Sequence, residues 1–286
     1  MTQLVEAIDG IYRVEFDNPK AQENTEVYLV RGAAAAIIET GPAIMVPEIL
    51  VALRLLDLHE RDIRYTILTH LHLDHAGGAG QLARELPNTK IVVHQRGAGH
   101  LIDPRKLIEG TQRAFGADFE KEHGAIVPIA SEQVLSVQGG ETLDLGGRQL
   151  ELVYTPGHAA HHLVILDRKT RGLFCGDTLG QYFPEVDLLV PVPALPLFNV
   201  EMTRESIEKI RRLKPAVLLF SHGGPRRDVE RLIRGFEDSI DILDTIASEA
   251  HSQGLDAEQL SERLRQHDTK VMDLLRSPRT PGNVRH

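Results

Sequence analysis

The chain has 286 residues, 42% hydrophobic and 26% charged, which is the balance of a soluble globular protein with one large domain or two small ones. Its net charge of -9 leaves no basic excess for phosphates and argues against a nucleic-acid partner. A single cysteine, Cys175, excludes an internal disulfide, and neither a signal peptide nor an apolar run of ~20 residues is recognisable, so we expect a cytoplasmic protein with no membrane partner.

The first third of the chain alternates strands with helices after an opening of strands alone. Strands rich in apolar and β-favouring residues are predicted for residues 8–16, 26–30, 33–39, 63–68 and 90–94. Residues 47–58 show an amphipathic helical pattern with Pro47 in the first turn, and residues 81–86 also indicate a helix. Residues 96–126 are polar and mostly helical in pattern, which predicts an insertion or wall over the sheet.

The strand pattern resumes in the second half. Further strands are predicted within residues 133–154 and at 163–166, 172–175 and 216–220, the middle two forming a hairpin. Residues 181–200 carry four prolines and are expected to form an ordered loop rather than a central strand or a helix. Helices are predicted for residues 203–213, 228–250 and 256–275.

The segment 69–78, Thr-His-Leu-His-Leu-Asp-His-Ala-Gly-Gly, follows a predicted strand directly. Alternate side chains of extended backbone share a face, so His70, His72 and Asp74 would project together, and His75 would join them as the chain turns. Three imidazoles at one strand end are costly to bury without a partner. Imidazole and carboxylate groups suit zinc, iron or manganese, so this segment predicts a metal site.

Three more strands end on a polar residue beside a small one. His158 follows a Tyr-Thr-Pro-Gly turn, Asp177 lies in Gly-Asp-Thr, and His222 lies in Ser-His-Gly-Gly. The small neighbours let the backbone come close to a shared centre. Each segment by itself could be a turn or a helix start, but four such strand ends in one chain indicate one site.

The order HxHxDH, Gly-His, Gly-Asp-Thr and a late His resembles the metallo-β-lactamase fold superfamily of hydrolases. It is most similar to the hydroxyacylglutathione hydrolase (glyoxalase II)-like branch, and His-Asp-His-Ala-Gly-Gly is also similar to N-acyl-homoserine lactonases. The resemblance implies an α/β (α+β) fold, a four-layer αββα sandwich with C-terminal helices and the site at one edge between the sheets. Residues 1–224 would form the catalytic domain, and residues 225–286 a helical extension packed on it.

The resemblance also implies two divalent metal ions, zinc first and iron or manganese as alternatives. The first would be held by His70, His72 and His158, the second by Asp74, His75 and His222, with Asp177 bridging them. A bridging aspartate holds two metals at ~3.5–4 Å, where they share and acidify one water. The resulting hydroxide would attack a carbonyl carbon, with Asp74 and Asp177 as the catalytic residues. We therefore expect a binuclear hydrolase of a small-molecule thioester, ester or lactone.

Other functions stay open at this point. Within hydrolysis, the alternatives are an N-acyl-homoserine-type lactonase and a promiscuous esterase or phosphotriesterase. From other classes, they are an iron-dependent sulfur dioxygenase and a non-catalytic metal-binding effector. The complete set of seven ligands argues against a non-catalytic protein, because loss of the bridging aspartate is the simple route to a dead site. The C-terminal helices could serve a homodimer.

Substrate contacts are less well marked. Tyr182 and Phe183 could form a wall of the pocket, and Arg226 could meet an anionic substrate; the alternatives are loop packing and a solvated helix start. The basic residues that bind glutathione in glyoxalase II enzymes have no match in the C-terminal region. Cys175 is expected in the core, and His162 behind a ligand. Four histidines are expected outside the metal site by their spacing: His94, His100, His123 and His161.

Overall fold

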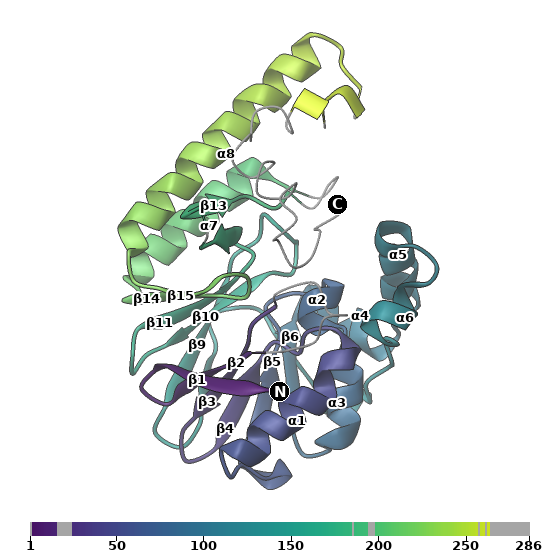
Figure 1. Cartoon of the computed structure of the whole chain (residues 1–286), viewed down its shortest axis with the longest axis vertical. Coiled ribbons are helices and arrows are strands. Elements are labelled where there is room, and N and C mark those ends of the chain that lie inside the picture. Colours follow the sequence, from purple (N-terminus) through teal and green to yellow (C-terminus); the bar gives the residue numbers. More distant parts are fainter. Residues whose placement is uncertain are drawn as a thin grey trace.

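The computed structural model describes residues 2–15, 25–184, 186–193, 198–256, 258–260 and 262–263. Two β-sheets pack face to face, and helices cover the outer face of each, as Figure 1 shows. The expected four-layer αββα sandwich is therefore confirmed. Within the described residues, no helix is both long and apolar enough to cross a lipid bilayer.

The first sheet has seven strands in chain order. They are β1 (Gln3–Ile8), β2 (Ile11–Glu15), β3 (Val27–Arg31), β4 (Ala35–Ile38), β5 (Ile63–Ile67), β6 (Lys90–His94) and β7 (Val134–Val137). Pairing is antiparallel from β1 to β4 and parallel from β4 to β7. The strand predicted at residues 8–16 is wrong at its start, because a turn at Asp9 and Gly10 makes it the second arm of a hairpin. β1 escapes prediction because this edge strand has no fully buried residue and hence a weak pattern.

The second sheet has six strands in the order β15-β14-β11-β10-β9-β8. They are β8 (Thr142–Asp144), β9 (Gln149–Tyr154), β10 (Leu163–Asp167), β11 (Gly172–Gly176), β14 (Val217–Phe220) and β15 (Gly224–Arg226). The predicted hairpin is β10–β11, and β14 joins β11 in parallel. The segment predicted as a loop contains a separate two-stranded sheet, β12 (Gln181–Phe183) and β13 (Leu188–Val190), so that prediction is corrected for these residues.

The helices are α1 (Val46–Leu55), α2 (Leu73–Ala76), α3 (Ala79–Glu85), α4 (Gln95–Ile102), α5 (Arg105–Phe115), α6 (Phe119–His123), α7 (Val200–Leu213) and α8 (Val229–Ser252). Short 3-10 turns cover Ala43–Met45, Glu60–Asp62 and Ser131–Gln133. α4 to α6 confirm the helical character predicted for residues 96–126. α7 begins three residues before its predicted start because the Asn199 side chain caps it by accepting from the Met202 amide at 2.8 Å.

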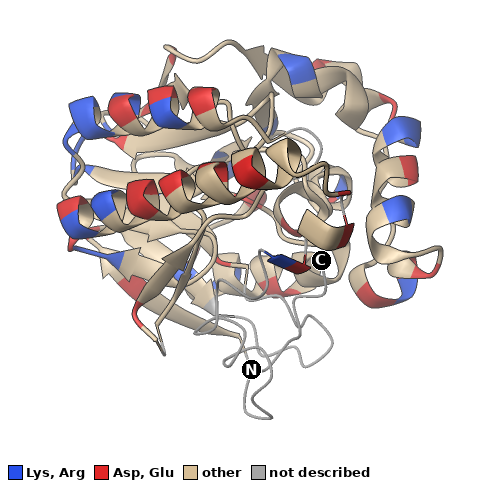
Figure 2. Ribbon diagram, turned by 90° about the horizontal axis from the view of Figure 1, so that it is seen from above, with Lys and Arg blue, Asp and Glu red and all other residues tan. Residues whose placement is uncertain are grey.

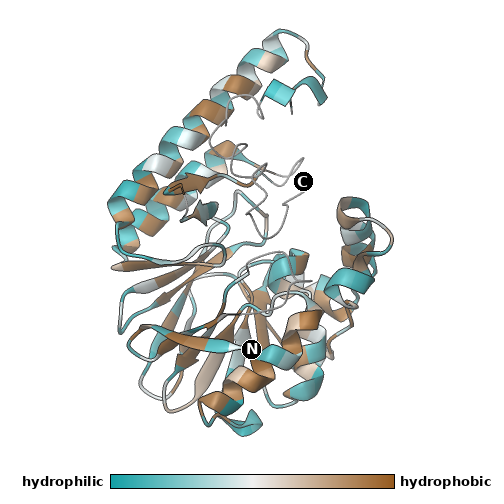
Figure 3. Cartoon of the chain, in the orientation of Figure 1, coloured by the Kyte–Doolittle hydropathy of each residue, from teal (hydrophilic) through white to brown (hydrophobic). Residues whose placement is uncertain are grey.

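Apolar side chains fill the three interfaces between the four layers. In Figure 3 the hydrophobic colour is frequent on the strands of the sandwich. Between the sheets, Tyr28 and Phe174 meet edge to face with ring centroids 5.4 Å apart. α1 packs on the first sheet through Ile49 and Leu53. Cys175 is fully buried under α7 and α8, so its predicted place in the core is confirmed.

α8 rises from the second sheet and projects beyond the body of the molecule (Figure 1). Leu232, Ile233 and Phe236 bury its first turns against that sheet. Figure 2 shows acidic and basic residues interspersed along the surface helices rather than gathered by sign. The division of the chain at residue 224 stays a prediction, and the helix predicted at residues 256–275 lies largely outside the described residues.

Candidate metal centre

The carboxyl ends of four strands meet at one edge of the sandwich. In the second sheet, β9, β11 and β14 run in the same direction, and they end just before His158, Asp177 and His222 respectively. In the first sheet, β5 ends just before His70, and the following turn enters α2. All seven residues predicted as metal ligands therefore lie together at this edge.

The first group joins three imidazoles. His70 Nε2 and His158 Nε2 each lie 2.9 Å from His72 Nδ1, and they are 3.2 Å from each other. The outer nitrogens are held by other partners: His158 Nδ1 donates to the Val192 carbonyl at 2.7 Å, and His70 Nδ1 lies 3.0 Å from Thr69 Oγ1. The rings of His70 and His158 are thus fixed from behind, and one nitrogen of each of the three rings lies at a common centre.

The second group joins Asp74, His75 and His222. Asp74 Oδ2 lies 3.1 Å from both His75 Nε2 and His222 Nε2, and the two imidazole nitrogens are 3.4 Å apart. α2 brings Asp74 and His75 onto one turn, and His72 precedes them as the helix N-cap residue. A single short helix therefore divides the HxHxDH segment between the two groups.

Asp177 faces both groups with different oxygens. Its Oδ2 lies 3.6 Å from His158 Nε2 in the first group, and its Oδ1 lies 3.4 Å from His75 Nε2 and 3.6 Å from His222 Nε2 in the second. The Oδ1 atom is buried and accepts no hydrogen bond from the described residues. A buried carboxylate oxygen without a donor is costly, so this atom suits a cation as its partner.

The two groups differ in protonation. Burial would lower the pKa of His75 and His222, but Asp74 and Asp177 outweigh it and raise both pKa values, so that protons there occupy the place of a cation. Burial lowers the pKa of His70 well below its usual range, and burial together with His158 lowers the pKa of His72 to about 3. These rings are neutral near pH 7 and offer lone pairs. Burial alone would raise the pKa of Asp74 and Asp177, but the neighbouring His75 and other histidines outweigh it and hold both pKa values below the usual range.

The donor set fits a pair of divalent ions. Tetrahedral zinc with Zn–N of ~2.0–2.1 Å places its ligand nitrogens about 3.3 Å apart, close to the 2.9–3.2 Å of the first group. The two groups share Asp177, as a bridged centre requires. The residues suit a divalent ion without selecting zinc over iron or manganese. Their assignment as ligands stays a prediction.

Glu39 lies at this site although the sequence did not reveal it. It follows β4, is fully buried and has a positive φ of 66°. Its carboxylate accepts from the Thr69 amide at 3.2 Å and from the Thr69 hydroxyl, and lies 3.1 Å from His75 Nδ1 and 3.4 Å from Ser221 Oγ. Glu39 thus connects Thr69, the predicted ligand His75 and Ser221.

Two further histidines support the site from behind. His162 is fully buried; its Nε2 accepts from the Asp177 amide at 3.1 Å, and its Nδ1 lies 2.9 Å from Thr178 Oγ1. Gly176 makes this approach feasible, because a Cβ there would lie 2.6 Å from His162 Nε2. His161 lies on the other side, where its Nε2 accepts from the Leu71 amide at 3.0 Å.

The residues predicted to contact substrate lie on the His222 side. Tyr182 donates its hydroxyl to Asp187 at 2.7 Å and stacks on Phe220 with centroids 6.2 Å apart, so its hydroxyl and ring are both engaged within the protein. The guanidinium carbon of Arg226 lies 4.2 Å from the centroid of the Tyr182 ring. Phe183 is half-buried in β12. Contact of these three with a substrate stays a prediction.

The chain is similar to several known proteins. It is 35% identical over 163 residues to the metallo-beta-lactamase fold-containing protein ST1585 of Sulfurisphaera tokodaii, covering 56% of this chain and 60% of that protein. It is 30% identical over 159 residues to thioesterase pkgB of Emericella nidulans (55% and 36%) and 26% identical over 196 residues to the human acyl-coenzyme A thioesterase MBLAC2 (60% and 64%). The matches therefore span less than two thirds of each relative.

Comparison of structures leads to the same group. The crystal structure of ST1585 from Sulfolobus tokodaii superposes with a TM-score of 0.64 and 25% identity, covering 82% of this chain and 86% of that one. The family model described as the metallo-beta-lactamase superfamily matches residues 22–222, which is more than half of the chain and includes every residue of the two ligand groups. The chain therefore belongs to the metallo-beta-lactamase superfamily.

Proposed function

We propose that the protein is a metal-dependent hydrolase that cleaves a thioester, ester or lactone of a small molecule at a two-metal centre. The observation that carries the proposal is the position of Asp177, whose two oxygens face the two ligand groups separately. His70, His72 and His158 would hold one ion, and Asp74, His75 and His222 the other. The bound ions would supply an acidified water and polarise the substrate carbonyl.

A thioester is the substrate class that we place first. Two of the relatives described above are named thioesterases, although the matches cover only 36% and 64% of their lengths. The glyoxalase II-like assignment, which also implies a thioester, belongs to the same proposal. Lactones, simple esters and phosphotriesters are the alternatives.

The chain's own residues would orient the reaction. Asp74 is half-buried and ionised, and lies between His75 and His222, where it can accept a proton from the attacking water. Glu39 accepts from His75 Nδ1, which orients the ring so that Nε2 lies beside Asp74 and Asp177, where it would hold the second ion once deprotonated. Cys175 takes no part, because it is fully buried and burial raises the pKa of its thiol.

The test is a hydrolysis screen on the full chain after metal analysis. The panel contains an acyl-coenzyme A, an acyl-glutathione, an acyl-homoserine lactone, an aryl ester and an aryl phosphotriester. We expect about two divalent ions per chain and the highest kcat/KM on one of the thioesters. Two bound ions without turnover on any member would refute the proposal. Oxygen consumption with a persulfide in an iron-loaded sample would instead favour the sulfur dioxygenase.

A further inference from the structure

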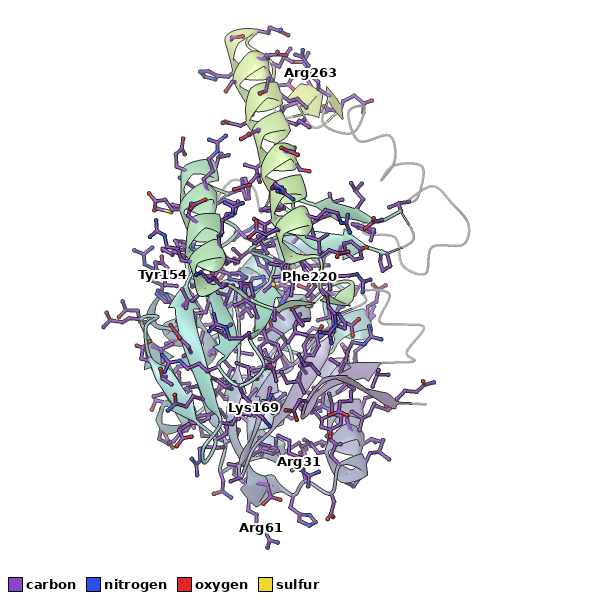
Figure 4. The ribbon with its side chains drawn as sticks, turned by 90° about the vertical axis from the view of Figure 1, so that its left-hand side faces the viewer. Arg31, Arg61, Tyr154, Lys169, Phe220 and Arg263 are labelled. Atoms are coloured by element: carbon purple, nitrogen blue, oxygen red, sulfur yellow. The ribbon has the colours of Figure 1, made fainter. Side chains whose placement is uncertain are left out.

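A group of basic side chains lies at the same sheet edge as the metal centre, on the side of His158. Arg96 is in the first turn of α4, and Lys209 projects from α7. Both approach the ring of Tyr154, the last residue of β9: Arg96 Cζ is 6.0 Å and Lys209 Nζ 5.5 Å from its centroid. With His161, these residues form what we call the basic flank. In Figure 4 its Tyr154 lies at the side of the molecule beneath α7, well apart from Phe220.

The flank is held in place by contacts of Tyr154. The His94 ring stacks on the tyrosine ring with centroids 4.3 Å apart and an interplanar angle of 8°. The tyrosine hydroxyl donates to the Ala160 carbonyl at 2.9 Å, and Lys209 Nζ donates to the Tyr154 carbonyl at 2.9 Å. Because both ends of the tyrosine are fixed, the two cations share a rigid aromatic platform.

His161 connects this platform to the metal centre. It follows Ala160 directly, and its ring centroid lies 6.5 Å from that of His70. Burial lowers the pKa of His161 to about 4, so the ring is neutral near pH 7. Since Nε2 accepts from the Leu71 amide, the single ring proton belongs to Nδ1. No described residue accepts that proton, which leaves Nδ1 as an available donor near His70.

The two cations also lack acidic partners among the described residues, whereas other surface arginines are paired. Arg168 pairs with Glu151 at 3.0 Å, and Arg211 pairs with Glu237 at 2.8 Å. Glu141, the acid whose charge acts on the stacked His94 ring, accepts from the amides of Gln138 and Gly139. Glu205 lies one turn before Lys209 on α7 and forms no ion pair with it in the described part of the chain. In a chain of net charge -9, the flank is therefore a local positive site beside the reaction centre.

We propose that the basic flank binds an anionic group of the substrate, a carboxylate or a phosphate, so that the enzyme acts on acidic esters or thioesters. This inference rests on the proposed hydrolase function for its substrate, although anion binding itself does not require turnover. Arg96 offers a planar fork that matches either anion, and Lys209 adds a second charge-assisted donor. The neutral His161 can donate from the side of the metal centre.

The test compares two double variants of the metal-loaded full chain. Arg96→Gln with Lys209→Gln removes the charges of the flank. Lys106→Gln with Arg113→Gln removes the same charge from exposed positions on α5 and is the matched control. Glutarate and inorganic phosphate are titrated calorimetrically into each protein. In parallel, mono-p-nitrophenyl glutarate, which keeps a free carboxylate, is compared as a substrate with the uncharged p-nitrophenyl butyrate.

We expect the flank variant to raise the Kd of at least one anion about tenfold or more, since a charge-assisted hydrogen bond carries about that factor. If the anion is a carboxylate, KM for the glutarate ester should rise similarly while its kcat and the butyrate kinetics stay unchanged. Preference for phosphate over glutarate would identify a phosphorylated substrate. The control variant should stay within about twofold of the original protein.

Equal losses in the two double variants, or unchanged anion affinity in the flank variant, would overturn the inference. So would a lack of measurable binding of both anions to the original protein. Failure of the hydrolase proposal would give a different result, because neither ester would be cleaved by protein with both ions bound. The calorimetric comparison would still decide whether the basic flank binds anions.

Discussion

Replacing Glu39 by Gln should weaken metal binding at the group of Asp74, His75 and His222. The side chain is fully buried and meets four donors: the Thr69 amide and hydroxyl, His75 Nδ1 and the Ser221 hydroxyl. Three of them approach Oε1 and one approaches Oε2. An amide has only one acceptor oxygen, so whichever way it turns, its NH₂ group faces at least one donor.

The magnitude follows from these contacts. A hydrogen bond to a charged group contributes ~1.5–3 kcal/mol and a neutral one ~0.5–1.5 kcal/mol, so the neutral glutamine should lower the free energy of unfolding by ~1–3 kcal/mol. The larger effect is on His75, which loses the carboxylate that orients its ring. Loss of such a supporting partner typically lowers metal affinity or activity 10–100-fold. We therefore expect the second ion to bind 10–100-fold more weakly, and kcat/KM to fall by a similar factor.

The assay is competition for zinc against a chromogenic chelator, read together with metal content and chemical unfolding. Asp167→Asn is the matched control, because Asp167 is another buried carboxylate but lies at the opposite end of the second sheet. It should lose stability and keep metal affinity. A Glu39→Gln protein that binds two ions as tightly as the original would refute the positioning role of Glu39.

Three other perturbations are informative. Asp177→Ala should lose one or both ions and nearly all hydrolysis, whereas the control His94→Ala should keep both ions. Elemental analysis of the two variants measures the metal content. Asp167→Asn should lower the free energy of unfolding by ~3–5 kcal/mol, because the buried Arg148 loses the negative charge that lies 2.9 Å away. Burial alone would raise the pKa of Asp167, but Arg148 and Thr170 outweigh burial and lower it. The pair should therefore stabilise the fold above the ordinary aspartate pKa and lose that effect as the pH falls through the lowered pKa of the folded state. Unfolding curves in acid should then show a smaller difference in stability between Asp167→Asn and the original protein. Gly157→Ala should displace His158 and reduce activity at least tenfold with little loss of secondary structure, because φ is 145° and a Cβ would lie 2.3 Å from Thr203 Oγ1.

Much of the fold and the whole candidate ligand set could be predicted from local patterns. Buried strands such as β11 and β14 are short apolar runs, and a polar residue beside a glycine follows each within two positions. Strands that run the same way in a sheet present their carboxyl ends at one edge. Four strands in this sequence are followed by a polar residue that can bind a metal ion. The sequence therefore also predicts that four side chains lie close together: His70, His158, Asp177 and His222.

The tertiary structure decided what has no local pattern. β1 is a half-exposed edge strand, so its sequence shows little alternation. Glu39 follows an apolar strand like many surface acids do, and only packing brings it to Thr69, 30 positions away, and Ser221, 182 positions away. His161 does not have the spacing of a ligand in the sequence, and only the fold brings its ring to 6.5 Å from that of His70. Ligands at strand ends can be predicted because the backbone of a strand is periodic. The groups that support these ligands, and the cations beside them, come from segments that are distant in the sequence. How close these segments lie in space is set by the packing of the layers.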